Sequence, residues 1–466
     1  MVEHNPCDPN RTEPDGAAPS RASTSESSIA RAQKRWHLMG FTHARVIEVR
    51  AFGKTVGAVA PSNTGGFAFQ YDSSWAKGGI ELSPILMPVS AGSRPFSFPG
   101  LPENTFHRLP PMIADSLPDK FGNSIVDAWL ATQGVTSTEV TALDRLTYLG
   151  DRGLGALEFK PTNSPESAPA GALDLAVLVS LARDAVQGTL SSDKQSERAL
   201  QQIFSVGTSA GGARAKAVVN YNPATEEIRA GNRIPSPGFS AWLLKFDGIG
   251  EDRQLGETQN YGRIEFAYSL MAAAAGIEIS QSRLLHENGR AHFITRRFDR
   301  SDGAAKLHSQ TLTGIAGIDF NAIGVNDYAQ LFNTIDQLAL GVSARQEAFR
   351  RMTFNIAAAN CDDHAKNHGF LMDKSGTWSL SPAYDITHAY NRGGEWTSQH
   401  LMGVNGKFMG VTHSELMEFA EQRSVLKAKT ILSDVNDAVE NWAEFAAEAG
   451  LSADHRDRVA DDHSRV

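Results

Sequence analysis

The strongest constraint on this chain is a polar run, NCDDHAKNH at 360–368, that lies between two apolar segments. A helical pattern ending in NIAAA precedes it, and GFL follows it. The run is hard to place as the solvated end of a helix, because both neighbouring segments are expected to enter a core. Asp362 and Asn367 have the D-x-x-x-x-N spacing of a protein-kinase catalytic loop. The run therefore indicates a phosphoryl-transfer site.

The spacing has a chemical reason. In such a loop the aspartate faces the acceptor hydroxyl, while the amide oxygen reaches a magnesium ion on the nucleotide phosphates. The segment SPAYDIT then supplies Asp385, a second carboxylate that can bridge magnesium to the phosphates. Asp363 is a second acid beside Asp362, but the distance in sequence to Asn367 favours Asp362 as the base. We expect substitution of Asp363 to be the milder change.

A kinase also needs a lysine near the phosphates. Lys245 in AWLLKFD is the candidate, because a buried strand disfavours lysine unless it has a partner. Glu265, on a predicted helix, is a possible ion-pair partner. The glycine-containing loop SAGGARAK (209–216) can direct backbone N–H groups at phosphates, although it matches no standard phosphate-loop motif. HFITRRFDR ends a predicted strand near Arg296–Phe298, an expected hinge whose backbone would bind adenine.

One alternative from the same residues is a metal-dependent hydrolase. His364 and His368 are one helical turn apart and have Asp362 nearby, so the three could be metal ligands. The glutamate of the H-E-x-x-H motif is missing, however, and this interpretation leaves Lys245 and the glycine-containing loop without a role.

Composition limits the class of protein. The 466 residues are 41% hydrophobic and 21% charged, which is typical of a globular chain. A net charge of −9 argues against nucleic-acid binding by phosphate neutralisation. The two cysteines, Cys7 and Cys361, do not indicate a structural disulfide. No apolar run reaches the ~20 residues of a membrane-spanning helix, so we expect a cytoplasmic protein.

Four regions are predicted along the chain. Residues 1–42 form a polar segment with too few apolar residues to build a core, and we expect a disordered tail there. Residues 43–160 are predicted to be a small α+β domain that begins with a hairpin. Residues 161–302 are predicted to be an α/β region with the glycine-containing loop, and 303–466 a mainly helical lobe. This order predicts an α+β fold with two lobes and a ligand site in the cleft between them.

The motifs together resemble one family. SAGGARAK, LLKFD, RRFDR, NCDDHAKN and SPAYD occur here in the order of the HipA family of serine/threonine kinases, which are the toxins of bacterial type II toxin–antitoxin systems. ADSLPDKFGN (114–123) and LDRLTYLGDRGLGALEF (143–159) resemble the small domain that precedes the kinase core in that family. The resemblance extends over residues 43–420. It implies a bilobal protein-kinase-like fold with a small N-terminal α+β domain and a mainly helical C-terminal lobe.

The resemblance also implies roles for individual residues. Asp362 and Lys366 would be catalytic, and Asn367 and Asp385 would bind magnesium. Ser209 matches a serine that HipA-like kinases autophosphorylate, which switches off ATP binding. The ATP site would comprise Gly211, Gly212, Ala213, Arg214, Ala215, Lys216, Lys245, Arg296, Arg297, Phe298, His364, Ala365, Lys366, Asn367, Tyr384 and Asp385.

Cofactors and partners follow from the same resemblance. ATP and Mg²⁺ are the expected cofactors, and a helix-turn-helix antitoxin of HipB type is the expected partner. DNA would be contacted only through that antitoxin, and no membrane is involved. The family's described substrate is glutamyl-tRNA synthetase, whose phosphorylation arrests growth. A catalytically weak scaffold or corepressor that acts through an antitoxin and DNA remains the alternative, and ATP turnover would distinguish the two.

Overall fold

The computed structural model describes residues 41–63, 65–164, 172–187, 214–231, 234–249, 260–301 and 305–466. Of the sequence predictions, most of the tail, together with Ser209, Gly211, Gly212 and Ala213, lies outside these ranges.

The N-terminal part is built on a four-stranded antiparallel sheet of order β3-β2-β1-β4. The predicted hairpin at Gly53 is present, and Gly53 has the positive φ of 77° that its tight turn requires. Alternate residues of the first strand, Ile47, Val49 and Ala51, are fully buried, as the apolar alternation predicts. The strands are β1 (Ile47–Ala51), β2 (Lys54–Pro61), β3 (Phe67–Tyr71) and β4 (Glu158–Lys160).

Short helices pack around this sheet. Residues 112–134 have helical spacing of apolar residues, but Pro118 interrupts the segment and Asp119 begins a new helix as its N-cap. The helices are α2 (Ser73–Gly78), α3 (Glu103–Phe106), α4 (Pro111–Ala114), α5 (Lys120–Thr132) and α6 (Ala142–Leu149), with 3₁₀ turns η1 (Val89–Ala91) and η2 (Ser137–Glu139).

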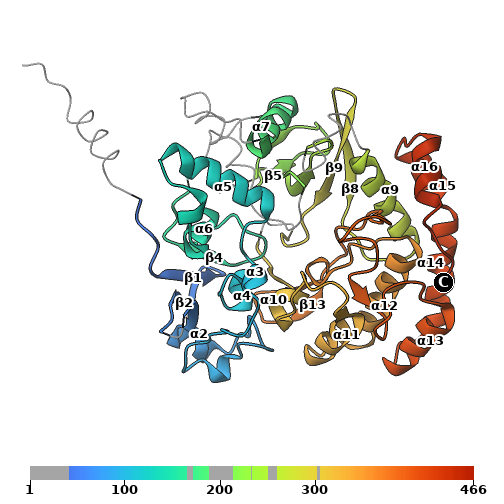
Figure 1. Ribbon diagram of the computed structural model, residues 1–466. Coiled ribbons are helices and arrows are strands. Elements are labelled where there is room, and N and C mark those ends of the chain that lie inside the picture. The colour runs from blue at the N-terminus through green and yellow to red at the C-terminus, as the bar shows by residue number, and fades with distance from the viewer. Residues whose placement is uncertain are drawn as a thin grey trace, which may run out of the picture. The chain divides into compact units, whose positions relative to one another are not determined.

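A second, five-stranded antiparallel sheet of order β6-β5-β7-β9-β8 follows (Figure 1). Helix α9 (Tyr261–Ala274) packs on β8 and β9, and α7 (Leu175–Gln187) packs on α5. Gly262 lies so close to the backbone oxygen of Ala291 that a Cβ would not fit there, which explains a glycine in the first turn of α9. The strands are β5 (Lys216–Tyr221), β6 (Ile228–Ala230), β7 (Ser240–Lys245), β8 (Ser282–Glu287) and β9 (Arg290–Arg296).

The C-terminal part is mainly helical, as predicted, but it also contains strands that the sequence did not reveal. A three-stranded sheet of order β10-β12-β13 and a parallel pair of β11 with β14 lie among its helices. Residues 434–450 have helical spacing throughout, and the structure divides them between two helices at Asn441. The elements are β10 (His308–Thr311), α10 (Leu312–Ala316), β11 (Asn326–Asp327), α11 (Tyr328–Gln337), α12 (Gly341–Ala357), η3 (Ala365–Asn367), β12 (Gly369–Met372), β13 (Trp378–Leu380), β14 (Met402–Gly403), α13 (His413–Gln422), α14 (Ala428–Glu440), α15 (Trp442–Glu448) and α16 (Ala453–Ala460).

Helix α9 joins the five-stranded sheet to the helical part. Its buried residues Ala267, Tyr268 and Met271 belong to the same apolar core as Phe349 of α12 and Val435 of α14. Residues 43–466 form one compact unit, and the domain boundaries within it stay predictions. In the described ranges, no helix is both long enough and apolar enough to span a membrane.

Candidate active site

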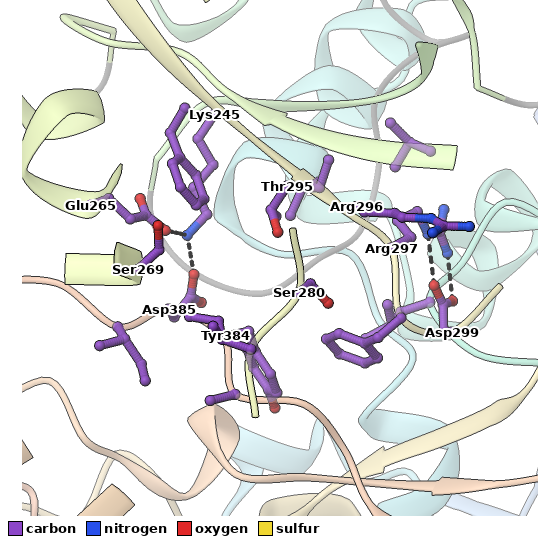
Figure 2. Close-up of a pocket in the computed structure, with 18 residues that line it drawn as sticks. Lys245, Glu265, Ser269, Ser280, Thr295, Arg296, Arg297, Asp299, Tyr384 and Asp385 are labelled. Atoms are coloured by element: carbon purple, nitrogen blue, oxygen red, sulfur yellow. Dashed lines mark hydrogen bonds and ion pairs between the residues drawn. The ribbon is translucent and has the colours of Figure 1, made fainter. Parts of the chain in front are cut away.

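A cavity lies between the five-stranded sheet and the segment that follows β13 (Figure 2). Lys245, Glu265 and Asp385 form one charged cluster in its wall, and the wall also includes Tyr384 and the charged residues Arg296, Arg297 and Asp299. A mostly apolar pocket with a few converging charges suits a ligand that has a flat ring and an anionic end. Its apolar lining consists of Leu154, Val218, Leu243, Ile279, Phe293, Phe298, Ala383 and Ile386.

Lys245 is the centre of this charged cluster. Its Nζ donates to Oε1 of Glu265 at 2.5 Å and also bonds Asp385, so the expected ion pair with Glu265 is present (Figure 2). Burial alone would lower the pKa of Lys245, but the carboxylates of Asp385 and Glu265 outweigh burial and raise it. The ammonium group is therefore charged, and it is held between α9 and the segment after β13.

Asp385 has an unusual backbone and a perturbed carboxyl group. Its φ is 53°, in the left-handed region that few residues other than glycine adopt. Burial would raise its pKa, but Lys245 and Lys216 lower it more, so the carboxylate is ionised. Strained residues of this kind gather at functional sites, where the surrounding structure holds them in place.

Asp362 is open to solvent. Its side chain is 38% exposed, and its Oδ1 accepts a hydrogen bond from Nε1 of Trp396 at 2.7 Å. His364 Nε2 lies 3.6 Å from the same oxygen. The side-chain amide of Asn367 donates to the backbone oxygen of Asp362 at 2.7 Å. This bond connects the last residue of η3 to the start of the loop. Asp362 thus keeps a partly exposed carboxylate on a constrained loop.

Asp363 has the opposite environment. Its side chain is fully buried and accepts from Oη of Tyr328 at 2.7 Å, from Nδ1 of His400 at 3.0 Å and from the backbone N–H of Leu401 at 2.7 Å. A carboxylate so enclosed cannot meet a substrate hydroxyl. Asp363 therefore anchors the loop to α11 and to the segment before β14.

Asn367 and Asp385 have the donor atoms that magnesium prefers. Both residues line one small cavity beside the larger one. The amide nitrogen of Asn367 is engaged with Asp362, which leaves its oxygen as the ligand atom. Oxygen donors suit a hard cation, and magnesium usually takes only one or two protein carboxylates and shares the rest of its coordination with phosphates and water. The residues present fit the ion.

The hydrolase alternative has no support in the structure. No group of three or more His, Cys, Asp or Glu side chains placed to hold a metal occurs within the part of the chain that the structure describes. His368 instead contacts the backbone oxygen of Asp363 through Nε2 at 3.2 Å, and burial lowers its pKa to about 4.

The described end of the glycine-containing loop also lies at the site. The guanidinium of Arg214 is 3.7 Å from Oε2 of Glu265 and stacks on Tyr261 at 4.2 Å. Ala215 is buried beside β7, and Lys216 begins β5. The side chain of Lys216 forms an ion pair with the carboxylate of Asp119 in the N-terminal part.

The structure brings the three predicted hinge residues to the cavity. Arg296, Arg297 and Phe298 all line the cavity, but the N–H groups of the two arginines already donate to Gln281 and Ala241. The Arg297 side chain forms a bidentate pair with buried Asp299, at 2.8 and 2.6 Å.

Tyr384 and Lys366 connect the hinge to the catalytic loop. The Tyr384 hydroxyl donates to the backbone oxygen of Lys366 at 2.7 Å, and its ring lies 5.4 Å from that of Phe298. The Lys366 ammonium lies over the ring of Phe320 at 4.8 Å. Ala365 is fully buried in η3.

Sequence reasoning missed Trp396, Asp119 and Asp299. Trp396 lies outside every motif, and nothing in the sequence indicates that it reaches Asp362. Asp119 belongs to ADSLPDKFGN and Asp299 to RRFDR, so the resemblance did contain both residues, but it gave neither of them a role.

Two family models match this chain. The HipA-like C-terminal domain matches residues 208–443, and the HipA N-terminal domain matches residues 47–160. HipA of Shewanella oneidensis MR-1, solved in a toxin–antitoxin complex with HipB and its operator DNA, has a similar fold. Its TM-score is 0.61 at 17% identity, over 89% of this chain and 94% of that one.

Two curated relatives come from Sinorhizobium fredii. "Putative kinase Y4mE" is 26% identical over 25% of this chain, and "Putative kinase Y4dM" is 24% identical over 46% of it. The matches span 30% and 53% of the length of these relatives. The two domain matches and the kinase-like fold establish that the chain belongs to the HipA family.

Proposed function

We propose that this protein is an ATP- and Mg²⁺-dependent serine/threonine protein kinase that transfers the γ-phosphoryl group of ATP to a protein hydroxyl. The observation that carries the proposal is the contact of Lys245 with both Glu265 and Asp385 at the edge of an apolar cavity. An ion pair between a strand lysine and a helix glutamate, beside a carboxylate suited to magnesium, is the arrangement that phosphoryl transfer requires.

Each residue has a defined task in this reaction. Lys245 binds the phosphates, and Glu265 keeps its ammonium in place. Asp362 accepts the proton of the substrate hydroxyl as the oxygen attacks phosphorus. Asn367 and Asp385 would hold magnesium, which neutralises charge on the phosphates when it is bound. Positioning and charge stabilisation supply most of the acceleration, because the protein forms no covalent intermediate.

Transfer of radiolabelled phosphate from ATP tests the assignment. Asp362→Asn and Asp385→Asn should each abolish transfer by the purified protein. Asp373→Asn, in an exposed turn, is the matched control and should keep full activity. A fully active Asp362→Asn variant would refute the assigned base. Absence of ATP turnover by the wild type would favour the scaffold or corepressor alternative.

The proposals about biological role, substrate and partner rest on membership of the family. We propose a growth-arresting toxin whose substrate is translation-related, with glutamyl-tRNA synthetase as the first candidate, and whose partner is a HipB-type antitoxin that contacts DNA. The structural relative, HipA of S. oneidensis, was solved with HipB and operator DNA, which supports the choice of partner. Phosphoproteomics after induced expression, compared with Asp362→Asn, would identify the substrate. Growth arrest that persists in Asp362→Asn would contradict a kinase toxin.

Ser209 is the proposed site of an autophosphorylating off-switch. Ser209 is the first residue of the glycine-containing loop. A phosphate on it adds a charge of roughly −1.5 to −2 there, which opposes binding of a triphosphate. Mass spectrometry after incubation with ATP, followed by calorimetric titration of ATP, tests the switch. An unmodified Ser209 in an active enzyme would rule it out.

A further inference from the structure

The motif ADSLPDKFGN in the N-terminal part reaches the candidate active site, although the proposed chemistry gives it no role. Oδ2 of Asp119 lies 3.1 Å from Nζ of Lys216, and the two side chains are only 6% and 4% exposed. Asp119 is also the N-cap of α5, since its Oδ1 accepts from the N–H of Gly122 at 2.7 Å. One carboxylate thus begins a helix of the N-terminal part and holds a lysine of the five-stranded sheet.

Lys216 lies beside Lys245. The two residues are Cα partners in the antiparallel pairing of β5 with β7. Residues opposite each other in such a pair have side chains on the same face of the sheet, with Cβ atoms about 5 Å apart. Two neighbouring ammonium groups repel each other, so each needs its own counter-ion. Lys245 has Glu265 and Asp385, and Lys216 has Asp119.

A second aspartate fixes the same motif to the C-terminal part. Asp115 accepts from both the backbone N–H and the hydroxyl of Thr311, each at 2.7 Å. Gly314 gives it room, since a Cβ there would lie 2.5 Å from Oδ2 of Asp115. Burial raises the pKa of Asp115, and the charge of Lys366 in the catalytic loop partly opposes that rise. Asp115 thus attaches the motif to the C-terminal part, and Asp119 attaches it to the five-stranded sheet.

We propose that Asp119 is a positioning residue for phosphoryl transfer: it holds the Lys216 ammonium beside Lys245 and so makes the N-terminal α+β part a component of the active site. The inference rests on the proposed kinase function. A fixed ammonium stabilises charge that develops in the transition state without reorganising, whereas a mobile one still attracts ATP in the ground state. Loss of Asp119 should therefore lower kcat without raising the KM for ATP.

Asp119→Asn tests this, because asparagine keeps the helix cap and removes the charge. We expect kcat to fall about tenfold, less than the loss of a direct transition-state donor typically costs. The KM for ATP should stay the same or fall, since a carboxylate near the triphosphate is gone. In a Lys216→Met background, Asp119→Asn should have no further effect on kcat. The matched control is Asp72→Asn at the N-cap of α2, which should change neither constant.

Accessibility of Lys216 is a readout that does not depend on activity. Trace acetylation followed by mass spectrometry should modify Lys216 several-fold faster in Asp119→Asn than in the wild type, while exposed Lys54 serves as the internal reference. If Asp119→Asn melts early in a thermal scan, Asp119→Ser, which also keeps a good N-cap, replaces it.

An unchanged kcat in a folded Asp119 variant would overturn the proposal, as would an equal loss of kcat in the Lys216→Met background. Either result would mean that Asp119 does not act through Lys216. A wild-type protein that transfers no phosphate would contradict the proposed function instead. The acetylation ratio would then decide the link between Asp119 and Lys216, and unchanged labelling would refute it.

Discussion

Asp363→Asn should destabilise the fold around the catalytic loop, so we no longer expect substitution of Asp363 to be the mild change that the sequence spacing predicts. The Asp363 carboxylate is fully buried and accepts hydrogen bonds from Tyr328, His400 and Leu401. Asparagine keeps one acceptor oxygen, but its NH₂ group cannot accept from Tyr328 or His400 and has no charge to balance the imidazolium.

The electrostatics of His400 give the size of the expected loss of unfolding free energy. Burial alone would lower its pKa, but the Asp363 carboxylate outweighs burial and raises the pKa of His400 from 6.5 to about 10. That rise corresponds to roughly 5 kcal/mol in favour of the charged imidazole. Removing one partner of a buried ion pair typically costs about 3–5 kcal/mol, because the other charge is left uncompensated. We expect Asp363→Asn to lose about 3–5 kcal/mol of unfolding free energy.

The contribution of the charged His400 to stability should decrease as the pH rises. A folded-state pKa above the unfolded value contributes stability that is fully present below about pH 6.5 and is lost as the pH rises toward 10. The wild type should therefore lose this contribution between pH 6.5 and 10, and Asp363→Asn should show a flatter profile because its His400 is no longer charged. Matched Asp373→Asn, in an exposed turn, should behave as wild type.

Hydrogen exchange of peptides that cover 360–372 and 400–404, together with thermal scans at pH 6.5 and 9, measures both effects. An Asp363→Asn variant that keeps wild-type protection and the wild-type pH profile would refute the reasoning.

The remaining predictions concern other contacts of the site. Trp396→Phe removes the hydrogen-bond donor that orients the Asp362 carboxylate and should lower kcat about tenfold with little change in the KM for ATP, whereas an unchanged kcat would argue against a positioning role for Trp396. Asp299→Asn leaves the guanidinium groups of Arg297 and Arg300 without their buried counter-ion and should cost about 3–5 kcal/mol in a denaturant titration. The pKa of Asp299 is lowered to about 2, so its contribution should disappear as the pH falls from about 4 to 2 in the wild type. Gly314→Ala should cost about 1–3 kcal/mol in the same titration, because its Cβ meets Asp115, while Gly100→Ala, where no atom lies within 4 Å of the added Cβ, should be neutral.

Local pattern predicted much of the fold. The alternation around Gly53 indicated the first hairpin, and apolar spacing indicated strands β5, β7 and β9 and helix α9. Their sequence signals are local, because the apolar residues that form each buried face recur two, three or four positions apart along the chain. The strands β10, β12 and β13 have only three or four residues each, which is too short for an alternating pattern to reveal them, and β10 pairs with β12 across more than 50 positions.

For the candidate site too, the sequence and the tertiary structure supply different information. Spacing and order in the sequence determined the chemical inventory: Asp362 and Asn367 on one loop, Asp385 after it, and a strand lysine with a helix glutamate. The spacing to Asn367 favoured Asp362 over Asp363, and the tertiary structure adds the physical difference between them: the side chain of Asp362 is partly exposed, whereas that of Asp363 is buried among hydrogen-bond donors.

Contacts between distant segments were decided by the tertiary structure as well. Trp396 reaches Asp362, and Asp119 reaches Lys216, from elements that chain folding brings together. Such pairs leave no signal in a single sequence, because neither residue's neighbours record what lies across the core. The sequence by itself determined which groups are available for phosphoryl transfer. The packing of the N-terminal part and the helical part around them determined which groups are exposed, charged and held in place.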